Sequence, residues 1–333
     1  MFQGPTDATL IAGMKTWHIN AVRIPLNEDC WLGLNGVPAT MSGTNYQKGI
    51  ANYVEMIRSG GLYVIVDLHM NSVGDVTAGG VNISDQQAMA DKAHSLDFWK
   101  SVASTFKGDQ GVVFDLYNEP AINDSSRTTT PCDGSTSQGA ACWQCWLSGC
   151  SLTTNVADPR SGSGKSIKTV TWATAGMQDM VNAVRSSGAT NVVMAGGWNY
   201  ASVLDQWMKY KPNDPLNNTS ASFHTYSGIN GCADSDATCL NNWWTAQLGG
   251  IVQGGFPVVT GEFGEYGGCN SESDFMTSWF AFADPKGFSY TAWTWDTWGG
   301  CAAGPNLISD YNGTPNGSAA QTYRDHLLML MPN

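Results

Sequence analysis

Short runs of apolar and β-branched residues alternate along the chain with longer segments in which apolar residues recur at the helical period. This alternation is typical of a parallel sheet whose strands are joined by crossover helices. Seven strands are predicted, at about residues 20–25, 63–69, 112–118, 191–195, 221–226, 257–262 and 289–293. Eight helices are predicted, at about residues 9–18, 46–60, 97–107, 171–188, 202–211, 241–253, 272–284 and 319–331.

The chain opens with a predicted helix and not with a strand. Its 333 residues suit a single α/β domain with the (β/α)8 TIM barrel fold, which occupies about 250 residues and accepts long insertions. One barrel strand is then unaccounted for. We therefore expect that the first strand is missing from the N-terminus of this sequence and that residues 1–333 form one domain.

One segment, at about residues 121–166, carries no sustained period and is rich in Gly, Ser, Thr and Cys. We interpret this segment as a Cys-rich loop insertion, because loops of such length are usually functional or cross-linked. Its four cysteines allow two disulfides in any of three pairings. They are Cys132, Cys142, Cys145 and Cys150.

The other five of the nine cysteines lie outside this insertion. Cys232 and Cys239 are expected to close a short loop, and Cys269 could meet Cys301. Cys30 is then left over, either as a free thiol or bonded to a cysteine upstream of Met1. Nine cysteines in one chain are typical of an oxidising compartment. We therefore expect a secreted protein with disulfide bonds.

Composition limits the partners that this protein can bind. A formal net charge of −12 argues against nucleic acid and against an anionic membrane surface. No apolar run reaches the roughly 20 residues needed to span a bilayer. Fourteen Trp residues supply rings that can stack on the apolar face of a sugar. We expect a monomer whose partner is a neutral polysaccharide or oligosaccharide.

Two glutamates follow predicted strands at the end where barrel catalysis takes place. Glu119 lies in an Asn-Glu-Pro motif after one apolar strand, and Glu262 ends another. Cleavage of a glycosidic bond needs such a pair. One acid protonates the leaving oxygen, and the other attacks the anomeric carbon or activates water. Either glutamate alone could equally be a surface acid at a strand end.

Other strand ends carry ionisable or aromatic groups that are expected at the same rim. A single histidine there is more often structural than catalytic, but the joint placement beside two glutamates favours a site. These residues are Arg23, His69, His224, Tyr226, Trp293 and Trp295.

The ordered set of strand-end motifs resembles glycoside hydrolase family 5, the cellulase family within the barrel clan of retaining glycosidases. The resemblance runs from about Thr9 to the C-terminus. The motifs that carry it are residues 20–25 (NAVRIP), 67–69 (DLH), 118–120 (NEP), 224–226 (HTY), 261–264 (GEFG) and 293–295 (WTW).

The resemblance implies a retaining glycosidase in which Glu119 is the acid/base and Glu262 is the nucleophile. It also implies that Asn118 binds the sugar 2-hydroxyl, and that Arg23 and Tyr226 hold Glu262 ionised and oriented.

The same resemblance assigns residues to sugar binding. His69 and His224 would line the sugar site, and Trp293 would form the floor beneath the ring. Trp295 is the alternative floor, and Trp198 is a candidate for an outer sugar subsite.

Three further acids look less promising. Glu28 and Asp29 are interpreted as solvated loop acids, and Glu265 lies beyond the strand that ends at Glu262. We expect neither a metal site nor a cofactor, because the chain shows no Cys/His cluster of zinc spacing and no phosphate-binding glycine motif.

The leading hypothesis is a hydrolase that cleaves O-glycosyl bonds of a polysaccharide, an endo-β-1,4-glucanase or cellulase. The resemblance leaves open other family activities, namely mannanase, exo-β-glucanase and glycosylceramidase. A hypothesis of a different class is a carbohydrate-binding barrel that has lost its chemistry. The intact pair Glu119 and Glu262 argues against it.

Overall fold

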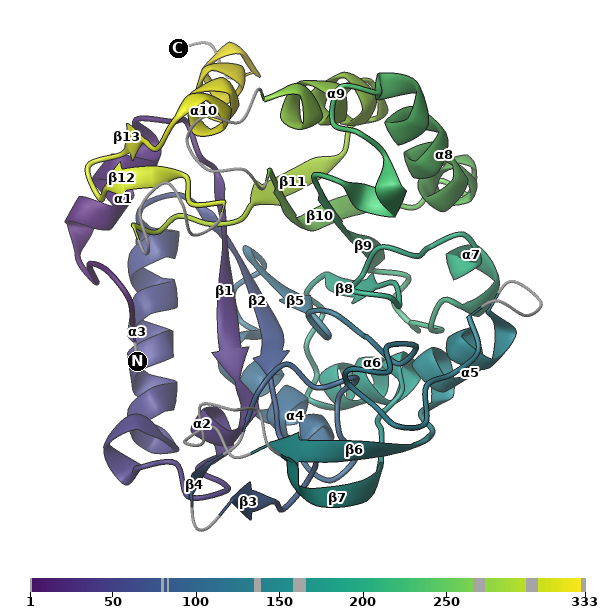
Figure 1. The fold of residues 1–333 in the computed structure, drawn as a ribbon. Coiled ribbons are helices and arrows are strands. Elements are labelled where there is room, and N and C mark those ends of the chain that lie inside the picture. Colours follow the sequence, from purple (N-terminus) through teal and green to yellow (C-terminus); the bar gives the residue numbers. More distant parts are fainter. Residues whose placement is uncertain are drawn as a thin grey trace. The chain divides into compact units, whose positions relative to one another are not determined.

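The computed structural model describes residues 2–78, 81–82, 84–134, 139–157, 166–265, 273–297 and 305–330. The chain divides into two compact units, and Figure 1 shows its elements. Unit 1 comprises Met1–Arg23, Tyr53–Val64 and Phe223–Asn333. Unit 2 comprises Ile24–Asn52 and Ile65–Ser222.

All seven predicted strands are present in the described residues. They are β1 (Ala21–Asn27), β2 (Tyr63–Met70), β5 (Val112–Asp115), β8 (Val193–Gly196), β9 (Thr219–Tyr226), β10 (Val258–Gly264) and β11 (Ser289–Ala292). Three short antiparallel hairpins add β3 (Thr77–Ala78) with β4 (Val81–Asn82), β6 (Ser151–Ala157) with β7 (Ser166–Ala173), and β12 (Ile308–Asp310) with β13 (Thr314–Pro315).

The helices alternate with these strands. They are α1 (Ala8–Lys15), α2 (Glu28–Leu32), α3 (Thr44–Ser59), α4 (Ser95–Phe106), α5 (Ala140–Ser148), α6 (Met177–Ser186), α7 (Trp207–Tyr210), α8 (Ala237–Gln253), α9 (Asp274–Ala283) and α10 (Ser318–Leu330). In unit 1, α8 and α9 pack side by side next to β10 (Figure 1).

The sheet is parallel wherever its register is known. Within unit 2 the strand order is β1-β2-β5-β8-β9, and within unit 1 it is β9-β10-β11. Phe114 of β5 lies opposite Val193 of β8, and Val259 of β10 lies opposite Ser289 of β11. Parallel strands joined by helices place their carboxyl ends at one edge, where site residues of a barrel gather.

Two strands of the sheet are buried along nearly their whole length. Seven of the eight residues of β9 are buried, and β10 is buried at six of seven positions. A strand covered on both faces needs apolar or internally paired side chains at nearly every position. Large rings fill the adjoining core of unit 1, where Trp244 and Trp279 lie edge to face with centroids 5.0 Å apart.

The segment at about residues 121–166 is more ordered than its composition predicts. It contains α5 and β6, and β6 pairs with β7 so that Leu152 lies opposite Trp172. The predicted helix start at residue 171 is wrong, because β-branched Thr169, Val170 and Thr171 pair in this hairpin. Helix α6 therefore begins only at Met177.

A second difference concerns the helix predicted at 202–211, which is reduced to the four residues of α7. The residues before it turn tightly, since Gly197 bridges Ala201 and Trp198 bridges Val203. Asn199 and Ala201 within this turn have positive φ, which is incompatible with a helix.

Three disulfides join the described residues. Cys132 pairs with Cys142, and Cys145 pairs with Cys150, which selects one of the three possible pairings in the insertion. Cys232 bonds Cys239 as predicted. Such cross-links stabilise mainly by restricting the unfolded chain.

The remaining cysteines are not cross-linked in the described part of the chain. Cys30 is half-buried and forms no disulfide there, and burial raises the pKa of its thiol. Cys269 and Cys301 lie outside the described residues. The described helices also include none that is long and apolar enough to cross a membrane.

Candidate active site

Glu262 lies on β10 in unit 1 and is held at both carboxylate oxygens. Arg23 of β1 donates from Nη1 to Oε1 at 2.7 Å, and the hydroxyl of Tyr226 at the end of β9 donates to Oε2 at 2.7 Å. Glu262 is only 5% exposed. Burying a carboxylate is costly unless it is paired and hydrogen-bonded, and the guanidinium and phenol provide both. The arrangement holds the carboxylate in one orientation.

Glycine at position 264 lets the neighbouring strands approach Glu262 closely. A Cβ at Gly264 would lie 3.0 Å from the ring of Tyr226 and 3.2 Å from the carbonyl oxygen of Trp293. Any larger residue would push Tyr226 or β11 away. This close approach explains why the strand carries the pattern Gly-Glu-Phe-Gly.

His224 and Trp293 also lie in unit 1, near β10. His224 is 1% exposed, and its Nδ1 lies 3.7 Å from Glu262 Oε2, longer than a hydrogen bond. The backbone N–H of Trp293 donates to the carbonyl of Phe263 at 2.9 Å, which fixes Trp293 beside β10.

Trp295 does not share the environment of Trp293. Strand β11 ends at Ala292, so both tryptophans follow the strand. Trp295 meets the fully buried Trp17 edge to face, with centroids 5.0 Å apart. This packing occupies one side of the Trp295 ring.

In unit 2, Asn118 and Glu119 follow β5, which ends at Asp115 rather than at residue 118 as predicted. The N–H of Asn118 donates to the carbonyl of Leu68 on β2 at 3.0 Å, so the segment stays anchored beyond the strand. Asn118 is 2% exposed. The backbone of Asn118 is therefore positioned by β2 as well as by its own strand.

His69 links Asn118 to a buried acid. Its Nδ1 lies 2.8 Å from Oδ2 of the fully buried Asp67, and its Nε2 lies 3.4 Å from Nδ2 of Asn118. A neutral imidazole that donates from Nδ1 to Asp67 accepts at Nε2 from Asn118. The chain Asp67–His69–Asn118 thus orients the amide that sequence analysis assigned to the sugar 2-hydroxyl.

Glu119 has a partner that sequence analysis missed. Gln86 donates from Nε2 to Glu119 Oε2 at 2.5 Å. The two residues are 33 positions apart, and the segment before α4 has no period that would predict this contact.

Trp198 is placed differently from the predicted outer subsite. It is 6% exposed and packs edge to face on Trp143. A Cβ at Gly139 would lie 2.7 Å from its ring, so the insertion covers the indole closely. This burial leaves little ring surface for a sugar.

Glu28 and Asp29 are fully buried, so the prediction of solvated loop acids is wrong. They begin α2, and Ser95 and Ser72 donate to them at 2.5 Å. Burial, followed by the charge of Asp91, raises the pKa of Glu28 well above its usual value. Burial and the nearby charge therefore favour the neutral form of Glu28.

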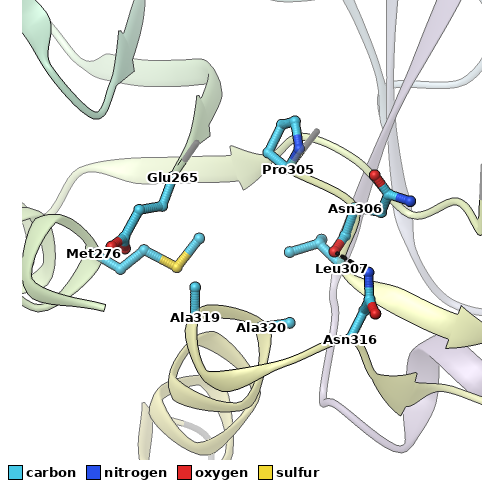
Figure 2. Close-up of a pocket in the computed structure, with 8 residues that line it drawn as sticks. All are labelled: Glu265, Met276, Pro305, Asn306, Leu307, Asn316, Ala319 and Ala320. Atoms are coloured by element: carbon cyan, nitrogen blue, oxygen red, sulfur yellow. Dashed lines mark hydrogen bonds between the residues drawn. The ribbon is translucent and has the colours of Figure 1, made fainter. Parts of the chain in front are cut away.

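Glu265 lies directly after β10, as predicted, and faces a small cavity of about 10 Å³ (Figure 2). Its carboxyl group turns toward Met276 and accepts from backbone N–H groups at the start of α9. Asn306 and Asn316 line the opposite side of the cavity. This volume is about the size of one water molecule and far too small for a sugar ring.

Replacing Glu265 should change how stability depends on pH. Burial raises its pKa from 4.5 to about 7, so the stability contributed by the neutral acid is complete below about pH 4.5 and is lost as pH rises through 7. Glu265→Gln cannot ionise and should avoid that loss. Denaturant unfolding should show the variant gaining up to about 3 kcal/mol over the parent chain between pH 4 and pH 8.

Glu55→Gln, at an exposed position on α3, is the matched control and should follow the parent chain. Parallel pH profiles for the parent chain and Glu265→Gln would contradict the prediction.

Within each unit taken by itself, the described residues bring together no three Cys, His or carboxylate ligand atoms that could hold a metal ion.

Comparison with known proteins places these observations in context. The family "Cellulase (glycosyl hydrolase family 5)" matches residues 1–299. An endo-β-1,4-glucanase structure from Xanthomonas axonopodis pv. citri aligns over 98% of this chain and 91% of its own, with a TM-score of 0.60 and 17% identity. A β-glucanase of Saccharophagus degradans in complex with cellotetraose aligns over 95% of this chain and 80% of its own, with a TM-score of 0.63 and 17% identity.

A curated relative matches over a shorter stretch. Endoglucanase C of Evansella cellulosilytica is 27% identical over 113 residues, which is 33% of this chain and 12% of the relative. The structural likeness, extending over nearly the whole chain, confirms the (β/α)8 barrel fold class.

Proposed function

Because the chain belongs to glycosyl hydrolase family 5, the cellulase family, we propose that it cleaves internal β-1,4 bonds of a glucan with retention of configuration. Membership makes the chain a glycoside hydrolase. The endo-β-1,4-glucanase likeness and the cellotetraose bound by a similar β-glucanase support this choice of substrate.

The environment of Glu262 carries the proposal. A nucleophilic carboxylate must stay ionised and must point one oxygen at the anomeric carbon. The hydrogen bonds from Arg23 and Tyr226 restrain both oxygens.

In the first step Glu262 attacks the anomeric carbon and forms a covalent glycosyl ester. The bond from that carbon to the glycosidic oxygen breaks, and neutral Glu119 transfers its proton to the departing oxygen. Asn118, oriented by His69, holds the 2-hydroxyl, where hydrogen bonds strengthen in the transition state.

In the second step Glu119, now ionised, takes a proton from water as the water oxygen attacks the anomeric carbon. The ester bond to Glu262 breaks, and its carboxylate returns to Arg23 and Tyr226. Both acids regain their starting protonation states, so the cycle balances.

The remaining site residues bind sugar in this proposal. His69 and His224 line the position of the reacting ring, and Trp293 lies beneath it. Trp295 and Trp198 are the weaker candidates, because one packs on Trp17 and the other on Trp143.

We propose that residues 1–333 form one catalytic domain with a Cys-rich insertion. Strands β1, β2 and β9 each begin in one unit and end in the other, so a division there would cut three strands. The three disulfides support secretion, and we propose a monomer that binds neither nucleic acid nor a membrane.

Assays of the purified chain on carboxymethyl cellulose, β-mannan and aryl β-glucosides test the proposal. We expect viscosity of carboxymethyl cellulose to fall faster than reducing ends appear, because internal cleavage shortens chains quickly. Proton NMR should show the β-anomer first. Preference for β-mannan would reassign the substrate, an initial α-anomer would exclude retention, and sugar binding without turnover would identify a binding protein.

A further inference from the structure

The hydrogen bond from Gln86 to Glu119 joins two segments of unit 2 that are far apart in sequence. Gln86 Nε2 lies 2.5 Å from Glu119 Oε2, and both side chains are partly buried. Gln86 precedes α4, whereas Glu119 follows β5. A contact of this kind requires that the backbone around Gln86 be held in place.

One set of bonds fixes the backbone at Gln86 itself. Asp85 and Asn71 form an antiparallel bridge, with N–H to carbonyl bonds of 3.1 and 3.0 Å. The carbonyl of Gln86 accepts from Arg127 Nη1 at 2.9 Å. The residue is thereby restrained on both sides.

A second set of bonds ties the next residues to the segment that carries Glu119. The hydroxyl of the fully buried Tyr117 lies 2.9 Å from the carbonyl of Gln87. The N–H of Ala121 donates to the carbonyl of Ala88 at 2.8 Å. These bonds lie on either side of Glu119 in the sequence. They tie the segment that carries Gln86 to the segment that carries Glu119.

The chemistry of an amide sets what this contact does. In the observed orientation the Gln86 amide donates through Nε2, and while it keeps that orientation Oε2 of Glu119 is an acceptor in both protonation states. The proton of neutral Glu119 is then placed on Oε1. The same bond stabilises the ionised carboxylate that serves as base in the second step.

We propose that Gln86 is a positioning residue for Glu119: it holds Oε2, directs the transferable proton to Oε1, and favours the ionised form. The inference rests on the proposed acid/base role of Glu119. It assigns a function to a side chain that no strand-end motif contains.

Gln86→Met tests this role, because methionine keeps the length of the side chain and removes its donor. We expect the alkaline limb of kcat/KM to move to higher pH. On phenyl β-cellobioside kcat/KM should fall roughly tenfold, short of the 10²–10⁴ expected for loss of an acid. On 2,4-dinitrophenyl β-cellobioside, which needs little acid assistance, it should stay within about twofold. A purely structural defect would lower kcat/KM equally for both substrates.

Gln87→Met is the matched control, since Gln87 contributes only its backbone carbonyl to the described hydrogen bonds. Its pH profile should equal that of the parent chain. Gln86→Asn shortens the side chain by one methylene group and should also move the alkaline limb of kcat/KM to higher pH. It serves as a second variant if Gln86→Met fails to fold.

A titration of ¹³C-labelled glutamate carboxyls tests the hydrogen bond without substrate, with Glu119 assigned from the spectrum of Glu119→Gln. The Glu119 midpoint should move to higher pH in Gln86→Met and not in Gln87→Met. An unchanged midpoint and pH profile in an active, folded variant would overturn this inference and leave the proposed function standing. A shift to lower pH would also overturn it, because Gln86 would then accept from the neutral acid. Absence of turnover by the parent chain on every β-glycoside would instead refute the proposed function.

Discussion

Glu262→Ala should lower turnover on carboxymethyl cellulose by about 10⁴-fold or more, since no other group can form the glycosyl ester. The structure gives a reason for so large a loss. Arg23 and Tyr226 both donate to this one carboxylate, and alanine removes that acceptor. The loss should appear on activated and unactivated substrates alike.

Azide should separate a missing nucleophile from a damaged fold. In Glu262→Ala the small anion can occupy the vacated space and attack 2,4-dinitrophenyl β-cellobioside directly, so turnover should recover and the product should be the α-glycosyl azide. Glu265→Gln, three residues further along, should retain parental activity without azide. Near-parental activity of Glu262→Ala would refute the assignment, and so would recovery that yields the β-azide.

Glu119→Ala should produce a selective defect. Hydrolysis of carboxymethyl cellulose should fall by about 10²–10⁴-fold, because its alcohol leaving group needs a proton. In contrast, kcat/KM for 2,4-dinitrophenyl β-cellobioside should change by only a few fold, since dinitrophenolate leaves without one. A series of aryl β-cellobiosides measured across pH checks both expectations.

The product formed with azide distinguishes the two glutamates. In Glu119→Ala the glycosyl ester still forms on Glu262, and azide then attacks from the face that water would use. The expected product is the β-glycosyl azide, the opposite configuration from Glu262→Ala. Equal loss on all aryl substrates, or an α-azide from Glu119→Ala, would show that Glu119 is not the acid/base.

The difference between these two variants follows from the environments of the two acids. Glu262 accepts hydrogen bonds from a guanidinium and a phenol, which restrain both of its oxygens. Glu119 is partly buried beside a neutral amide, which permits both protonation states. An acid/base must alternate between those states within one cycle.

Local sequence was sufficient for the repeating elements and for the residues at strand ends. A strand buried on both faces is usually apolar along most of its length, as β2 is, so β2 could be predicted from its composition. Parallel strands with crossover helices then require that Arg23 and Glu262 lie at strand ends of the same type.

Contacts between distant segments could not be predicted in this way. Trp198 was expected at a sugar subsite, but its burial depends on Trp143 and Gly139 in the insertion. Glu28 was expected in solvent, but Ser95 and the surrounding core enclose it. Burial is a property of the neighbours that a residue acquires on folding, and its own type does not reveal them.

The sequence by itself determined the α/β repeat, and it predicted Glu119 and Glu262 as the catalytic residues. Only the tertiary structure decided which oxygens Arg23 and Tyr226 bind and that Gln86 reaches Glu119. The physical reason is range: strand and helix patterns arise from neighbours a few residues apart, whereas a hydrogen bond across 33 or 239 residues exists only after the chain has closed on itself.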